Sequence, residues 1–97
     1  MGALASLRDH RNEILHLAES FGAGDVRVFG SAARGEDGEN SDIDLLVTWS
    51  ASASLTDWAG FQQEVERLLG RHVDVVSEKS LHWSIRDKVL AEARPLP

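Results

Sequence analysis

The sequence contains no cysteine and has too few basic residues to balance its acidic ones. Without cysteine the chain forms neither disulfides nor thiolate zinc sites, which fits a cytoplasmic protein. Ten lysine and arginine residues stand against sixteen acidic residues, for a formal net charge of −6 at pH 7. Nucleic-acid binding depends on basic side chains that neutralise phosphates. This balance therefore counts against a nucleic-acid partner and favours a basic protein partner.

Long apolar runs are also missing. No stretch of the sequence is long enough to cross a bilayer, so we expect no membrane partner. The N-terminus lacks the basic start and apolar stretch of a signal peptide. The chain has 97 residues, of which 42% are hydrophobic and 27% charged, and we expect one globular domain over residues 1–97.

Helical periodicity appears early and again in the middle of the chain. Apolar residues at i, i+3, i+4 and i+7 predict one amphipathic helix over residues 3–21. A short helix is expected to open at 31–34. A further helix is expected to start at a Thr56 N-cap and to end at Gly70.

A last helix should begin near Ser80 or Ser84 and end before the C-terminal prolines. Its expected buried side consists of Leu81, Ile85 and Val89. Three short apolar runs, at 26–30, 43–49 and 72–77, are typical of buried strands. Helices and strands that alternate in this way predict an α/β (α+β) fold.

Three carboxylates accompany the predicted strands. Asp42 and Asp44 lie two residues apart, so their side chains should point to the same face. Asp74 lies in an otherwise apolar run and could face the same site if its strand lay beside the second. Three carboxylates suit magnesium, which prefers hard oxygen ligands. Two such ions could activate an acceptor hydroxyl and neutralise a leaving pyrophosphate.

A Gly-Ser pair follows the first predicted strand. Gly30 lets the backbone approach a phosphate closely, and Ser31 at a helix start can donate its hydroxyl beside free backbone N–H groups. Arg34, three residues later, could reach the same phosphates or a carboxylate. Together with the carboxylates, this turn predicts a metal and phosphate site that serves nucleotide transfer from a triphosphate.

Each element also has a plainer explanation. A Gly-Ser pair after a strand is commonly just a turn, Asp42 could only cap a strand, and Arg34 could lie on the surface. Asp74 could pair with Arg27 or Arg71 in a structural salt bridge. The combination favours the functional interpretation, because all elements occur in order, at strand ends, in one small domain.

The histidines and tryptophans give a weaker signal. The histidines share no ligand spacing, and only His72, two residues from Asp74, stands out. The three tryptophans are expected to pack, although Trp49 and Trp83 could anchor a protein interface, where tryptophan is enriched.

Three segments of the sequence together resemble the minimal nucleotidyltransferases (MNT) of the DNA polymerase beta superfamily. They are Gly30-Ser31-Ala32-Ala33-Arg34-Gly35-Glu36, Ser41-Asp42-Ile43-Asp44-Leu45-Leu46-Val47 and Val73-Asp74-Val75-Val76. The resemblance covers about residues 10–94 and implies a small mixed β-sheet flanked by helices, the polymerase-beta-like nucleotidyltransferase fold. It also implies that Gly30 and Ser31 hold the triphosphate, and that Asp42, Asp44 and Asp74 bind Mg²⁺.

The resemblance further implies a substrate and a partner. Many minimal members are encoded beside a HEPN-domain toxin and act as its antitoxin, and some transfer AMP from ATP to a tyrosine of the toxin. We therefore expect ATP as substrate, Mg²⁺ as cofactor and a HEPN-domain toxin as partner, which leaves a hetero-oligomer open. Two alternatives remain: an antitoxin that acts by binding alone, and a small-molecule adenylyltransferase.

Overall fold

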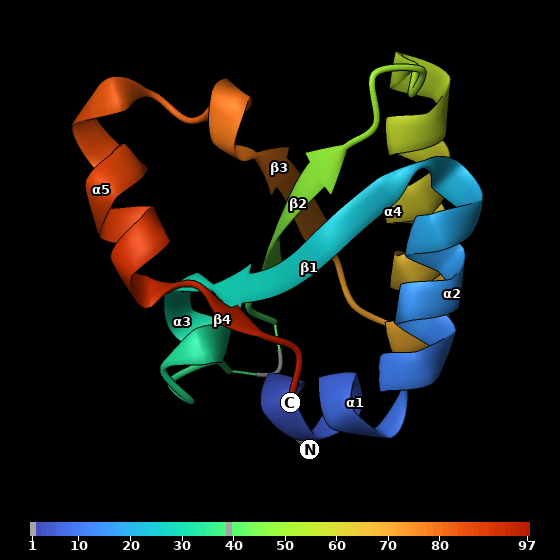
Figure 1. The fold of residues 1–97 in the computed structure, drawn as a ribbon. Coiled ribbons are helices and arrows are strands. Elements are labelled where there is room, and N and C mark those ends of the chain that lie inside the picture. The colour runs from blue at the N-terminus through green and yellow to red at the C-terminus, as the bar shows by residue number, and fades with distance from the viewer. Residues whose placement is uncertain (1, 39) are drawn as a thin grey trace.

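The structure is a computed structural model that describes residues 2–38 and 40–97. Its elements, labelled in Figure 1, follow in chain order: α1 Ala3–Asp9, α2 Arg11–Phe21, β1 Ala23–Phe29, α3 Gly30–Ala33, β2 Ile43–Trp49, α4 Leu55–Leu69, β3 Val73–Ser77, the 3₁₀ helix η1 Glu78–Ser80, α5 Trp83–Glu92 and β4 Arg94–Pro95.

One four-stranded sheet in the order β3-β2-β1-β4 forms the centre of the molecule. The pairs β1·β2 and β1·β4 are antiparallel, whereas β2·β3 is parallel. The parallel pair is reached through α4, which crosses one face of the sheet, as such a connection requires. The predicted α/β (α+β) fold with a small mixed sheet flanked by helices is confirmed.

The two faces of the sheet are covered differently (Figure 1). α2 and α4 lie side by side against one face, and α5 stands on the other. The face toward α2 and α4 carries the alternate apolar residues of the strands, which join Ile14, Phe61 and Val65 in one core cluster. The other face carries Asp44 and Asp74, so we call it the carboxylate face.

The expected helix over 3–21 is two helices. The chain bends at His10, whose backbone (φ −111°, ψ 15°) is not helical, and α1 turns away beneath the sheet toward α3. Ala3 and Leu7 of α1 and Ile14 and Ala18 of α2 are all buried. One continuous apolar stripe therefore serves two helices, which is why periodicity did not reveal the bend.

The start of α4 was also misplaced. Ser54, not Thr56, is the N-cap: its hydroxyl accepts the backbone N–H of Asp57, and the Asp57 carboxylate accepts the backbone N–H of Ser54. This reciprocal capping box needs an acidic residue three positions after the cap, which Ser54 has. The predicted end of the helix at Gly70 is confirmed.

The predicted buried side of α5 is confirmed at Val89 and wrong at Leu81 and Ile85. Leu81 precedes the helix, Ile85 is 48% exposed, and Val89 is the buried residue of α5. The buried Val89 lies in the C-terminal half of the helix, whereas Trp83 at its start is 82% exposed. The short strand β4 was not predicted. In the part of the chain that the structure describes, no helix has the length and apolar character to span a membrane.

Candidate active site

The centre of the carboxylate face is a row of three residues on adjacent strands. Asp44 of β2 is the register partner of Phe29 on β1 and of Asp74 on β3. Because Phe29 immediately precedes Gly30, the Gly-Ser turn and two of the carboxylates meet at the same level of the sheet. The strand order that the hypothesis required, with β3 beside β2, is observed.

Asp44 is half-buried, and its pKa is raised to about 6. Burial is the largest cause, because it disfavours the charged form, and the negative charges of Asp74 and Asp42 act in the same direction. The charge of Arg34 acts against them, and that of Glu92 adds to them. Asp44 is therefore repelled by the negative charges of both other aspartates.

Asp74 does not lie in the apolar surroundings expected for it. Its side chain is exposed on the carboxylate face, so Asp44 is the carboxylate that burial affects here. The two arginines considered as its structural partners have other contacts. Arg27 pairs with Glu78 at 2.9 Å, and Arg71 pairs with Asp37 at 3.0 Å.

Asp42 lies one residue before β2, with its side chain 51% exposed. Its Oδ1 is 3.1 Å from Nδ1 of His72, whose Nε2 is 3.6 Å from Glu66. His72, which stood out in the sequence because it lies two residues from Asp74, thus contacts Asp42. Among residues 2–38 and 40–97, no three histidine or acidic side chains are already arranged as a metal site. Asp42 would have to turn from His72 to join Asp44 and Asp74.

Gly30 fits tightly against Asp44. Its φ is +72°, and a Cβ at this position would lie 2.4 Å from Oδ2 of Asp44. Any side chain would therefore meet both an unfavourable backbone conformation and the carboxylate. Ser31 and the first N–H groups of α3 follow directly. The Gly30–Ser31 turn and the Asp44 carboxylate thus lie directly against each other, which the sequence spacing alone could not establish.

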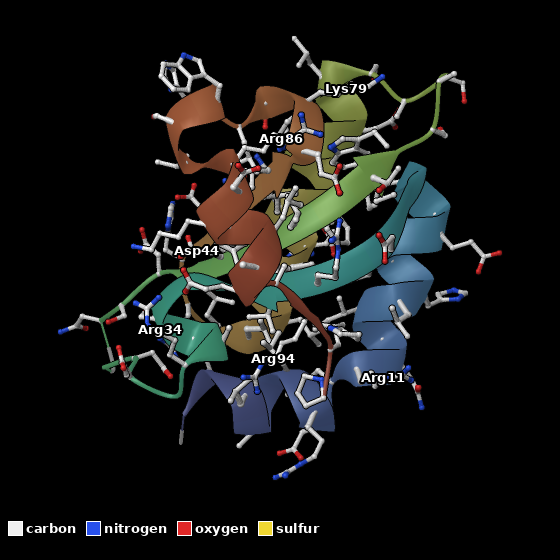
Figure 2. The ribbon with its side chains drawn as sticks, turned by 60° about the vertical axis from the view of Figure 1, so that its left-hand side comes forward. Arg11, Arg34, Asp44, Lys79, Arg86 and Arg94 are labelled. Carbon is white, nitrogen blue, oxygen red and sulfur yellow. The ribbon has the colours of Figure 1, made fainter. Side chains whose placement is uncertain are left out.

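Arg34, at the end of α3, takes part in two ion pairs on this side of the molecule (Figure 2). Its Nε donates to Glu36 at 3.0 Å, and its Nη1 contacts the Glu92 carboxylate at the end of α5. Both hydrogen bonds raise the pKa of the guanidinium, that with Glu36 more. Glu92 was not predicted, because it lies 58 residues from Arg34 and no motif marks it.

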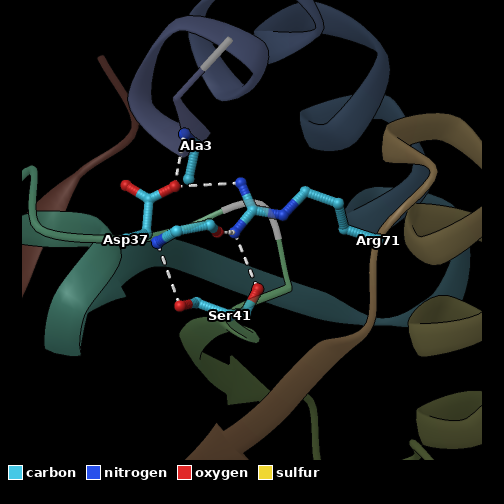
Figure 3. A network of polar contacts seen from close by, with 5 residues as sticks. Ala3, Asp37, Ser41 and Arg71 are labelled. Atoms are coloured by element: carbon cyan, nitrogen blue, oxygen red, sulfur yellow. Dashed lines mark hydrogen bonds and ion pairs between the residues drawn. The ribbon is translucent and has the colours of Figure 1, made fainter.

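A buried ion pair holds Asp37, which lies between α3 and β2 (Figure 3). Asp37, 4% exposed, accepts from Arg71 and from the backbone N–H of Ala3 at 2.9 Å. Arg71 also donates to the carbonyls of Gly38 and Ser41. Burial alone would raise the pKa of Asp37, but the bonds from Ala3 and Arg71 outweigh it and lower that pKa. This network holds the chain immediately before Asp42.

Two clefts lie away from the carboxylates. One of about 690 Å³ runs between α2 and α4, with Leu17 and Leu68 among its lining residues. Another of about 350 Å³ lies where β2 and β3 end, with Trp49 and Lys79 in its lining. Neither is lined by the three aspartates, so the carboxylate face is a separate region of the surface.

Comparisons with known proteins agree on one family. The nucleotidyltransferase domain model matches residues 7–96. The protein adenylyltransferase MntA of Thermococcus cleftensis is 41% identical over 86 residues, which cover 89% of this chain and 84% of that protein. A Methanocaldococcus jannaschii protein assigned as a protein adenylyltransferase is 35% identical over 88 residues, covering 91% and 95% of the two chains.

Solved structures agree with this result. A structure described as a minimal nucleotidyltransferase superposes with a TM-score of 0.88 at 48% identity, over 99% of this chain and 97% of the other. A toxin–antitoxin structure with AMP-PNP shares the fold, with a TM-score of 0.73 at 24% identity over 89% and 71% of the two chains. With a family model that covers most of its length and relatives above 30% identity, this chain belongs to the nucleotidyltransferases, as a minimal nucleotidyltransferase.

Proposed function

We propose that this protein transfers AMP from ATP to a hydroxyl group of a partner protein, in a reaction that depends on Mg²⁺. The observation that carries the proposal is the position of Asp44. It lies against the Gly30 turn on one side and beside Asp74 on the other, and its pKa is raised to about 6 by burial and by neighbouring negative charge. Such an arrangement suits a bound cation next to bound phosphates.

The residues present fit magnesium in their chemistry. Asp42, Asp44 and Asp74 supply hard oxygen donors, and the repulsion among them is what a divalent cation would relieve. When bound, magnesium would increase the acidity of the acceptor hydroxyl and neutralise charge on the leaving pyrophosphate. Asp42 is half exposed, and its contact among the described residues is with His72, so we infer that it turns toward the other two when the cation binds.

The neighbouring turn is proposed to hold the triphosphate. Ser31 and the N–H groups after Gly30 would bind its terminal phosphates, with Arg34 close by. The acceptor oxygen then forms a bond to the α-phosphorus, and the bond from that phosphorus to the bridging oxygen of the β-phosphate breaks. Pyrophosphate leaves, and the hydroxyl proton passes to a carboxylate of the site.

The nature of the partner is proposed from the relatives. MntA of Thermococcus cleftensis is named a protein adenylyltransferase, and structures of a toxin–antitoxin with AMP-PNP and of MntA with HpeT share this fold. We infer that the acceptor is a toxin, of the HEPN class in our proposal, which this protein modifies as its antitoxin in the cytoplasm. The net charge of −6 suits a basic partner.

Two alternatives concern what the carboxylates do. An antitoxin that acts by binding alone has no use for a half-buried carboxylate among like charges, because such a group opposes folding. A small-molecule adenylyltransferase would use the same residues with another acceptor. The intact set of three aspartates favours an enzyme, and the similarity to protein adenylyltransferases favours a protein acceptor.

The test uses the purified protein with ATP, magnesium and, as the toxin candidate, the product of a gene next to its own. The proposal predicts that the candidate's mass increases by one AMP and that chelation of magnesium prevents this. Tight binding without a mass increase would support the antitoxin that acts by contact. Turnover of ATP in the absence of any protein acceptor would support the small-molecule enzyme.

A further inference from the structure

Glu92 stands at a point where the backbone is fixed from both sides. It is the last residue of α5, whose C-terminal half is anchored by the buried Val89. Two residues later, Arg94 begins β4 and pairs in register with Val28 of β1. The backbone position of Glu92 is therefore well defined.

The Glu92 carboxylate reaches from this point to Arg34. Its side chain is 22% exposed, whereas Glu36, the other partner of Arg34, is 65% exposed and lies only two residues along the same turn. The exposed Glu36 carboxylate restrains the Arg34 guanidinium weakly, because the two residues move together and solvent screens their attraction. Glu92 therefore supplies the restraint that links Arg34 to the rest of the fold.

These two contacts use two of the three nitrogens of the guanidinium. Nε donates to Glu36 and Nη1 contacts Glu92, while Nη2 has no hydrogen-bond partner among the residues that the structure describes. Arginine carries five N–H donors in a rigid planar fork, so fixing two nitrogens also fixes the direction of the third. The positive charge of the same guanidinium acts to lower the pKa of Asp44.

We propose that Glu92 is a positioning residue, which holds Arg34 so that its remaining donors point to the triphosphate bound at the Gly30–Ser31 turn. The inference rests on the proposed function, because it assumes a triphosphate at that turn. It assigns a role in nucleotide binding to the end of α5, through Arg34 rather than by contact with the nucleotide. A carboxylate that acted directly on the triphosphate would repel it.

The test is a double-mutant cycle on binding of a non-hydrolysable ATP analogue with magnesium, measured by isothermal titration calorimetry. Glu92→Gln keeps the shape of the side chain and removes its charge. We expect it to weaken binding about fivefold, the size of a modest ion-pair effect. In an Arg34→Ala background the same change should have no effect, because the group through which Glu92 acts is gone.

Two further variants separate positioning from stability. Glu36→Gln, the matched control, should change affinity less than twofold, and Glu92→Asp, which keeps the charge, should bind more tightly than Glu92→Gln. Melting temperatures of all variants are measured alongside, since a purely structural role would lower melting without changing the affinity of the folded protein.

The possible results discriminate between the two proposals. Unchanged or tighter binding by Glu92→Gln overturns the inference, as does an equal change in both backgrounds, which would mean that Glu92 acts by its own charge. In either case the wild type still binds the analogue and the proposed function stands. Failure of the wild type itself to bind the analogue overturns the proposed function and this inference with it.

Discussion

The two faces of the sheet differ in the side chains that they carry and in the contacts that cover them. The face against α2 and α4 is closed by apolar side chains, and Phe61 and Val65 of α4 are fully buried on it. The other face holds Asp44 and Asp74 and is covered by α5, of which only Val89 is buried. There the contacts that hold α5 include ion pairs, from Arg34 to Glu92 and from Arg86 to Glu78.

This difference indicates where stability and chemistry are located. Apolar burial on the first face is the dominant favourable contribution to folding. On the second face like charges gather beside a half-buried carboxylate, which opposes folding. A chain of 97 residues has little stability to spare, so an arrangement of this kind points to function. The predictions below separate the two faces, beginning with the largest expected effect.

Asp44→Asn should lower AMP transfer by about a thousandfold or more, equivalent to about 4 kcal/mol of transition-state stabilisation. The amide has almost the shape of the carboxylate but cannot hold a cation by charge. The measurement is the rate of AMP incorporation into the partner, with circular dichroism to show that the variant is folded. Full activity in a folded Asp44→Asn protein would show that Asp44 is not part of the active site.

Phe61→Ala changes the face of the sheet toward α2 and α4, and it should lower only the free energy of unfolding. Phe61 is fully buried and packs near Phe21 and Trp49, so its truncation should cost about 3–5 kcal/mol. Denaturant unfolding measures this loss. The control is Leu55→Ala in the same helix, where the side chain is 82% exposed and the expected change is within about 0.5 kcal/mol. Similar losses from both substitutions would contradict the assignment of the core face.

The stability of the protein should depend on pH in part through the titration of Asp44. Its pKa of about 6 in the fold exceeds the value of about 3.9 expected for an unfolded chain, so folding favours its protonated form. This contribution is fully present below about pH 4 and is lost as pH rises through about 6. Because Asp44 is partly exposed to solvent, we expect a loss of about 1 kcal/mol.

The comparison between wild type and Asp44→Asn isolates that contribution. Other carboxyls act in the opposite direction: the pKa of Glu78 is lowered, chiefly by its hydrogen bond from Arg27, so its contribution is lost as pH falls. These groups are common to both proteins and cancel in the difference. The stability of the wild type relative to Asp44→Asn should therefore decrease between pH 4 and pH 7, and a flat difference would contradict the raised pKa.

Ser31→Ala should have the smallest effect. One neutral hydrogen bond contributes about 0.5–1.5 kcal/mol, so AMP transfer should fall less than about tenfold. Titration with the ATP analogue should show the same modest loss. A loss as large as that of Asp44→Asn would mean that Ser31 does more than help hold a phosphate.

Much of this architecture could be predicted from local patterns. The second strand was predicted with its observed bounds, Ile43–Trp49, because five of its seven residues are apolar. The turn at Gly30 was predicted because a glycine after a strand allows another group to approach the backbone closely. What the sequence did not contain was the identity of the approaching group, which is Asp44.

The misses share a physical cause: they depend on contacts between residues far apart in sequence. Asp74 was expected to be surrounded by apolar groups, but its side chain is exposed on the carboxylate face. Ile85 was predicted to be buried, but its side chain is exposed. Periodicity shows which residues share a helix face and does not show what covers that face. Arg71 was considered as a partner of Asp74, and it pairs with Asp37 across 34 residues.

The central claim is that the carboxylate face is a site for magnesium and a nucleotide whose charges oppose folding when it is empty. Thermal melts of the wild type and Asp74→Asn test it most directly, each with chelator and with magnesium and ATP. The account predicts that Asp74→Asn melts at the same or a higher temperature than wild type in chelator, because a repelling charge is gone. Magnesium with ATP should raise the melting temperature of the wild type and not of the variant. A lower melting temperature for Asp74→Asn in chelator, or an equal rise in both proteins with magnesium and ATP, would contradict the account.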